Sequence, residues 1–142
     1  MQKIPIFVLI SNEKLKSYII DLCSKNNLRT FTGADLEELV KNIKKKSGAV
    51  VVMDYEIVNA YGARIYSRIN VACPGCNLLL LCDQDHRDII KEAVAHDVYA
   101  CILPPYEEWE VLTMIRNIIA KEKLQDQKKF YKNKEFNRDR IH

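Results

Sequence analysis

Residues 49–54 read Ala49-Val50-Val51-Val52-Met53-Asp54, an apolar run that ends in a carboxylate. A run that is apolar at every position, without alternation, is typical of a strand that is buried on both faces of a sheet. The carboxyl end of such a strand lies at the edge where doubly wound α/β proteins bind their ligands. Asp54 is therefore the first candidate for a functional residue.

Four more short apolar runs share this strand pattern, and segments with helical spacing lie between them. The alternation of one strand with one helix predicts an α/β fold with an open, doubly wound, five-stranded parallel sheet, the flavodoxin-like (α/β)5 arrangement. The last helix is expected to begin after Pro104-Pro105, because proline suits a helix start. The other expected strands are Ile4–Ile10, Leu28–Phe31, Asn77–Cys82 and Tyr99–Leu103.

The size and charge of the chain predict one domain followed by a short basic extension. The 142 residues are 48% hydrophobic and 29% charged, which is typical of a globular protein. Residues 121–142 hold eight Lys/Arg against four Asp/Glu, so they account for the net charge of +3 and leave residues 1–120 at −1. We expect residues 1–120 to form the domain and residues 121–142 to be a helical extension or a linker that leads to an output domain.

No segment resembles a signal peptide or a membrane span, so the sequence predicts a cytoplasmic protein that does not contact a membrane. The basic extension mixes both signs of charge and has no nucleic-acid recognition motif. Nucleic acid is therefore expected to be bound only through an output domain.

Over about residues 4–120, the sequence resembles the receiver domain of two-component response regulators. In that family an acidic pair follows the first strand, the phospho-accepting Asp ends the third, Ser or Thr ends the fourth, and Lys-Pro ends the fifth. The resemblance assigns Asp54 to the phospho-acceptor. The partner positions differ from the family: Ser11 and Asn12 replace the acidic pair, Cys82 the hydroxyl residue, Pro104 the lysine, and Cys101 the aromatic switch residue.

These replacements predict a degenerate phosphorylation site. Phosphoryl transfer to a carboxylate needs Mg²⁺, which is held by carboxylates and water, and only a weak site at Asp54, Asn12 and Glu13 is possible here. Pro104 has no charge and no N–H group to pair with a phosphoryl group, and the Cys82 thiol is a weak donor. We expect no catalytic residue and no cofactor, with Mg²⁺ bound only if Asp54 is phosphorylated.

In the absence of that chemistry, Asp54 is expected to be a strand-end carboxylate that is capped by nearby backbone N–H groups. The substitution Asp54→Asn would then leave the fold nearly intact, because a neutral amide avoids a buried charge.

The resemblance thus implies an atypical receiver, a pseudo-receiver, that is not an enzyme and acts in signal transduction or transcription regulation through protein–protein contacts, independently of phosphorylation. In the family, the fourth helix, fifth strand and fifth helix commonly form a dimer or contact an output domain. The equivalent segment here is residues 85–120. We expect a homodimer through this segment, with Tyr99 and Trp109 as candidate anchors.

Two other functions stay open. The first is a conventional receiver in which Asp54 is phosphorylated. The second is a thiol-redox or small-ligand-binding α/β protein.

The five cysteines do not indicate a disulfide scaffold, because their number is odd and four lie in or beside apolar runs. Cys73-Pro74-Gly75-Cys76 has the spacing of a redox pair or of half a zinc site. A redox pair usually begins a helix, whereas this one precedes a strand, and a zinc ribbon needs a second such pair. We interpret the four residues as a Pro-Gly turn with two unpaired thiols.

Overall fold

The computed structural model describes residues 4–44, 46 and 48–141, and the side chains as far as Gln125. Its five strands form one parallel sheet in the order β2-β1-β3-β4-β5, which confirms the predicted doubly wound architecture. The strands are β1 (Ile6–Leu9), β2 (Thr30–Thr32), β3 (Val50–Asp54), β4 (Asn77–Leu81) and β5 (Ala100–Ile102). The helices are α1 (Glu13–Lys25), α2 (Leu36–Ile43), α3 (Tyr55–Tyr61), α4 (Arg64–Ala72), α5 (Arg87–Ala95) and α6 (Glu108–Ile141).

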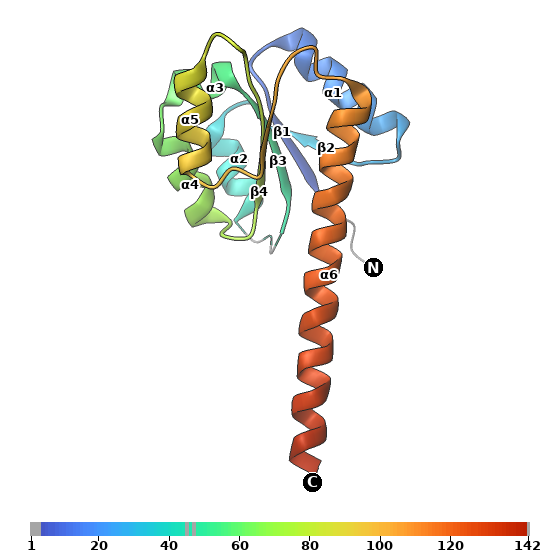
Figure 1. Ribbon diagram of the computed structural model, residues 1–142. Helices are drawn as coiled ribbons and strands as arrows, with labels where there is room; N and C mark the ends of the chain where they lie inside the picture. The colour runs from blue at the N-terminus through green and yellow to red at the C-terminus, as the bar shows by residue number, and fades with distance from the viewer. Residues whose placement is uncertain (1–3, 45, 47, 142) are drawn as a thin grey trace.

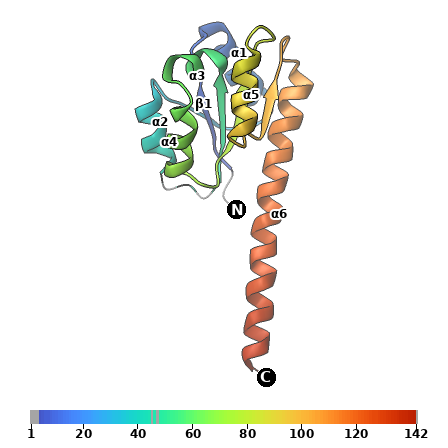
Figure 2. The same cartoon turned by 60° about the vertical axis from the view of Figure 1, so that its left-hand side comes forward.

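The helices cover both faces of the sheet and give the protein two separate cores. Helices α1 and α6 lie on one face, and α2 to α5 lie on the other (Figures 1 and 2). Side chains alternate between the faces along each strand, so Val50 and Val52 pack toward α1 and α6, whereas Val51 and Met53 pack toward the other layer. Both faces of β3 are therefore buried, as its unbroken apolar run predicts.

The segment between β3 and β4 differs from the prediction of one helix per strand. It contains two helices, α3 and α4, which are separated at Gly62. Gly62 has φ +81°, a left-handed conformation that favours glycine, and its N–H group donates to the carbonyl of Val58 at 2.8 Å. Glycine at this position ends α3 and lets the chain turn into α4.

Helix α6 is much longer than the part of it that covers the sheet. It begins at Glu108, shortly after Pro104-Pro105, and its 34 residues continue through the extension to Ile141. The view in Figure 1 shows it running far past the edge of the sheet. No described helix combines the length and the apolar character that crossing a membrane requires.

Candidate functional site

Asp54 lies at the carboxyl end of β3, where it is completely buried and its carboxylate is bound by backbone donors. Oδ1 accepts hydrogen bonds from the N–H groups of Ser11 (3.2 Å) and Ile57 (3.1 Å), and Oδ2 accepts one from the N–H group of Asn12 (3.1 Å). The donors belong to the loop after β1 and to the first turn of α3. The carboxylate therefore joins these two segments to the end of β3, and three hydrogen bonds compensate its burial.

The residues at the positions of the acidic pair contribute their backbones to this site and not their side chains. The Asn12 side chain accepts from the N–H group of Leu15 at 3.0 Å and caps α1. Glu13 points elsewhere, because its exposed carboxylate pairs with Lys16 at 3.2 Å. The structure thus brings Ser11 and Asn12, but not Glu13, to Asp54.

This arrangement fits a bound cation poorly. Among the described residues, Asp54 is the only carboxylate that accepts hydrogen bonds from Ser11 and Asn12, and both of its oxygens face N–H donors, which carry partial positive charge. Across the described residues, no three His, Cys, Asp or Glu side chains are grouped so that they could hold a metal ion.

The loop between β5 and α6 is fastened next to Asp54 by two tyrosines. The Tyr106 hydroxyl donates to the carbonyl of Cys82 at 2.5 Å, and the Tyr18 hydroxyl of α1 donates to the carbonyl of Tyr106 at 2.7 Å. Burial raises the pKa of Tyr106 to about 12, and the nearby charges of Asp83 and Asp54 contribute to the same shift. Tyr106 therefore remains a neutral hydrogen-bond donor at physiological pH.

Pro104 lies in this loop and stands at the position of the family's lysine. It is exposed, and it is joined to Pro105 by a cis peptide bond. A proline offers neither a charge nor an N–H group, so this position supplies no donor to an anion near Asp54.

Cys82 and Cys101 form a pair of thiols on the face of the sheet that α2 to α5 cover. Cys82 is completely buried at the end of β4, and Cys101 is partly exposed on β5, in register with Leu80. The neighbouring Cys82 thiol lowers the pKa of Cys101 to about 7, and the Cys82 thiol itself donates to the carbonyl of Leu80 at 3.8 Å. The neighbouring Cys101 thiol, together with burial, raises the pKa of Cys82. The hydroxyl and switch positions of the family thus hold two neighbouring thiols.

Exposed apolar side chains lie along α5, β5 and the start of α6. Trp109, in the first turn of α6, is 67% exposed, and Val94 of α5 is also 67% exposed. Tyr99 and Leu103, at the two ends of β5, are 36% and 39% exposed. Residues 85–120 therefore carry several large apolar groups that the rest of the described chain leaves open to solvent.

The interpretation of Cys73 and Cys76 as unpaired thiols is wrong, because the structure joins them in a disulfide. The Pro-Gly turn brings their Cα atoms to 5.4 Å, a separation that a disulfide can span. The free cysteines are Cys23, Cys82 and Cys101.

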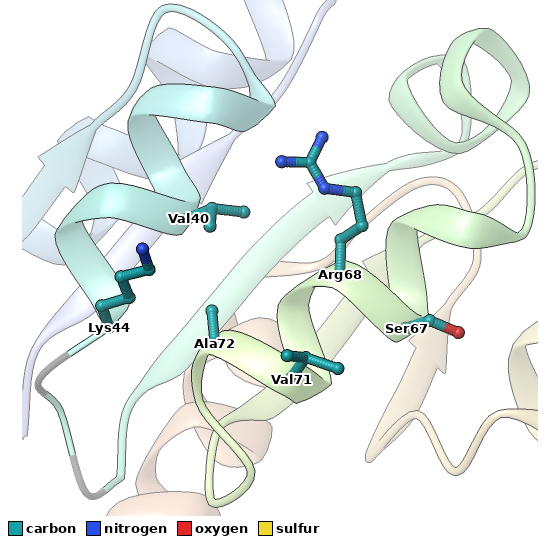
Figure 3. Close-up of a pocket in the computed structure, with 6 residues that line it drawn as sticks. All are labelled: Val40, Lys44, Ser67, Arg68, Val71 and Ala72. Atoms are coloured by element: carbon teal, nitrogen blue, oxygen red, sulfur yellow. The ribbon is translucent and has the colours of Figure 1, made fainter.

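A groove of about 490 Å³ lies between α2 and α4, away from Asp54 (Figure 3). In the close-up, Arg68 and Lys44 reach up from the two helices, and Val40 and Ala72 lie between them. Arg68 is engaged in a two-point ion pair with Glu37 of α2. The groove is lined by Val40, Lys44, Ser67, Arg68, Val71 and Ala72.

Sequence reasoning missed the two tyrosine hydroxyls and the buried amide of Asn77. Tyr18 stands within the apolar spacing of α1, and the sequence gives no sign that its hydroxyl reaches Tyr106, 88 residues away. Asn77 does carry a signal, because it is a polar residue directly before four leucines. A polar side chain at the start of a buried strand needs a hydrogen-bond partner.

Neither a protein-family model nor a curated protein matches the sequence. Solved structures do match the fold, and one is a response regulator receiver domain from Clostridium thermocellum, with a TM-score of 0.74 and 18% identity over 86% of this chain and 98% of that chain. The chain has the receiver-domain fold.

Two other solved structures with this fold are not described as isolated receiver domains. The adenylate cyclase structure from Rhodopirellula baltica gives a TM-score of 0.77 with 18% identity, and covers 94% of this chain and 99% of that chain. NtrX from Brucella abortus, in complex with ADP, gives a TM-score of 0.76 with 14% identity over 92% of this chain. This chain spans 29% of the NtrX chain. At these identities the likeness establishes the fold alone.

Proposed function

We propose that this protein is a receiver-like signalling module that works through protein–protein contacts, without phosphorylation and without enzymatic activity. The observation that carries the proposal is the state of Asp54. Its side chain is completely buried, and its two oxygens accept three backbone N–H bonds. A phosphodonor would have to displace these bonds before it could reach the carboxylate.

The residues around Asp54 support the same proposal. A phosphorylated receiver needs Mg²⁺ and a cation to balance the phosphoryl charge. Here Glu13 pairs with Lys16, and Pro104 occupies the lysine position. We therefore propose that the module uses neither Mg²⁺ nor another cofactor.

The proposed output has two parts. The exposed side chains Trp109, Tyr99 and Val94 support a homodimer, or docking of a partner, through residues 85–120. The long α6 supports a connection from this domain to an output domain in the cytoplasm, which in a transcription regulator would bind nucleic acid. The association state, rather than phosphate, would then carry the signal through mass action.

Exposure to a small acyl phosphate with Mg²⁺, and separately to beryllofluoride, tests the proposal. We expect no phosphoryl adduct by mass spectrometry and no saturable shifts of the amide NMR signals of Ser11, Asn12 and Ile57. A receiver domain with the complete set of family residues is the positive control for the reagents. A stable adduct that Asp54→Asn abolishes would show the conventional receiver instead.

A further inference from the structure

Asn77 holds α6 against the amino end of β4. Apart from Asp54 it is the only polar residue that is buried among the described residues, with 6% exposure. Its Nδ2 donates to Oε1 of Glu122 at 2.9 Å, and Nζ of Lys121 donates to its Oδ1. We call Asn77, Lys121 and Glu122 the clasp. The clasp satisfies both ends of a buried amide with two consecutive residues of one helix, so it fixes both the position and the rotation of α6 at this turn.

Two further contacts hold the same turn of α6. The Lys121 ammonium lies 5.1 Å from the centre of the Tyr99 ring, within the range of a cation–π interaction. Gly48 packs so closely that a Cβ atom there would lie 2.6 Å from Oε2 of Glu122. The loop before β3, the start of β4 and the residue before β5 all meet α6 at this point.

The Cys73–Cys76 disulfide lies directly beside the clasp. Cys76 immediately precedes Asn77, and Nδ2 of Asn77 also lies 3.5 Å from the carbonyl oxygen of Gly75, inside the disulfide loop. The Asn77 N–H group donates to Ala49 at 2.8 Å, which fixes the backbone of the clasp to β3. Any change in the conformation of residues 73–76 is therefore passed to Asn77 through one peptide bond and one side-chain contact.

The surroundings of Cys73 suit the reduced form as well as the disulfide. Its Sγ lies 3.5 Å from the carbonyl oxygen of Lys46. A disulfide sulfur has no hydrogen to donate to this oxygen, whereas the thiol formed by reduction does. Reduction would thus free Cys73 to bond to Lys46, and would shift residues 73–76 together with the Gly75 carbonyl that Asn77 contacts.

We propose that Cys73–Cys76 is a thiol–disulfide exchange site for a protein or small-molecule dithiol, and that its reduction loosens the clasp on α6. Cys73 is 1% exposed and Cys76 is partly exposed, so attack occurs at Sγ of Cys76. A thiolate of the dithiol bonds to this sulfur, and Cys73 leaves as a thiolate that takes up a proton. The second thiol of the reductant then attacks the reductant sulfur that is bonded to Cys76. Cys76 leaves as a thiolate that takes up a proton. Two electrons and two protons pass to the protein, and the reductant becomes a disulfide.

This inference goes beyond the proposed function, because it supplies an input that replaces phosphate. It uses the proposed cytoplasmic location in one respect: disulfides that form in the cytosol are usually redox-sensing or catalytic. The test below measures α6 directly and involves neither Asp54 nor a phosphodonor, so its failure would leave the proposal of a phosphorylation-independent receiver unaffected.

Thiol counting is the first experiment. The full chain is equilibrated with oxidised lipoic acid, denatured, alkylated and weighed by mass spectrometry. We expect alkylation of the three free cysteines before treatment with dithiothreitol and of all five after it. Alkylation of all five cysteines without dithiothreitol would overturn the proposal.

Hydrogen exchange of the backbone amides in α6 is the second experiment. We expect reduction to raise the exchange rate of peptides around Lys121 about tenfold, because loss of the clasp lets this part of the helix open locally. Peptides from α3, on the opposite face of the sheet, serve as the internal control and should not change. Equal exchange around Lys121 in the oxidised and reduced chains would overturn the proposal.

Variants separate the disulfide from the clasp. Cys73→Ser/Cys76→Ser should exchange at the fast rate with or without dithiothreitol. The double variant Lys121→Met/Glu122→Ala removes both partners of Asn77 on α6 and leaves Asn77 and the cysteines in place, and circular dichroism establishes that it is folded before its exchange is measured. It should exchange fast in both redox states. A response of this variant to dithiothreitol as large as that of the natural chain would overturn the role of the clasp.

Discussion

The Tyr18 hydroxyl donates a hydrogen bond to the main-chain carbonyl of Tyr106 across 2.7 Å. This bond joins α1 to the loop between β5 and α6, and the Tyr106 hydroxyl continues the connection to the carbonyl of Cys82. The two phenols thus tie together three segments at the carboxyl edge of the sheet. This edge is where receiver-like folds place their phosphorylation site, and here it is closed by internal hydrogen bonds.

Removing either hydroxyl should weaken the fold measurably. We expect Tyr18→Phe and Tyr106→Phe each to lower the free energy of unfolding by about 1 kcal/mol, the usual worth of an intramolecular hydrogen bond. Urea unfolding monitored by circular dichroism measures the loss. Tyr99→Phe is the matched control, because the Tyr99 ring contacts Lys121 without a hydroxyl hydrogen bond among the described residues. Losses equal to that of the control would contradict the role of these phenols.

Asp54→Asn should destabilise the protein by about 1–3 kcal/mol, because the amide nitrogen is itself a donor and would face a backbone N–H group in a buried site. This expectation replaces the one from sequence, which included capping N–H groups but weighed only the cost of the buried charge; with three donors on the two oxygens, an amide NH₂ group is the costlier choice. Asp35→Asn is the control, since Asp35 caps α2 at an exposed position where asparagine caps equally well. Urea midpoints within error of each other for the two variants would refute the prediction.

Cys101 should react with iodoacetamide faster than any other thiol of the native protein. Its pKa of about 7 lies below the usual value, so its rate should rise through pH 7 and level off by about pH 8. Burial raises the pKa of Cys23 to about 11, so this thiol stays protonated and slow. Peptide mapping after short pulses of reagent gives each rate. In Cys82→Ala the midpoint for Cys101 should move up, because the neighbouring thiol that lowers its pKa is gone; an unchanged midpoint would show that Cys82 has no such effect.

Gly48→Ala should displace Glu122 without disturbing the core. The added Cβ would meet the end of a flexible side chain, so we expect a loss of no more than about 1 kcal/mol in the free energy of unfolding. Glu122→Ala should abolish the penalty in the double variant, and a double-mutant cycle on urea unfolding tests this. Gly33→Ala is the control, since a Cβ there meets its nearest neighbour at an ordinary 3.5 Å. Additive losses in the cycle would show that Gly48 and Glu122 are independent.

Trp109→Ala should weaken self-association with little change in stability, because the side chain is 67% exposed. Sedimentation equilibrium of the intact chain at high micromolar concentration should show a dimer, and the variant should shift toward monomer at least tenfold in dissociation constant. Val71→Ala, on the opposite layer and 82% exposed, is the control for loss of an exposed apolar group. An intact chain that is strictly monomeric would leave only docking to another domain.

The sequence predicted the parts of this fold that depend on periodicity. Runs such as Ala49–Met53 are apolar on both faces, and a parallel sheet is the arrangement that buries both. The capping of Asp54 by backbone N–H groups also matches the prediction, since any buried carboxylate must find donors. The clasp could not be predicted, because Asn77 and Glu122 are 45 residues apart and the pairing depends on where α6 crosses the sheet edge. The disulfide was not predicted, because an odd number of cysteines in or beside apolar runs is typical of reduced thiols, and only the folded Pro-Gly turn brings Cys73 and Cys76 together.

Because α6 is long, a small rotation at the clasp would move its far end by a large distance. Residues 123–141 continue the helix for about 30 Å at the usual rise of 1.5 Å per residue. A tilt of about 10° at the clasp would move the far end of such a rod by about 5 Å, roughly the length of one helical turn. The loss of one hydrogen bond at Asn77 would thus displace the far end of α6, which lies well away from the sheet in Figure 1, by several ångströms.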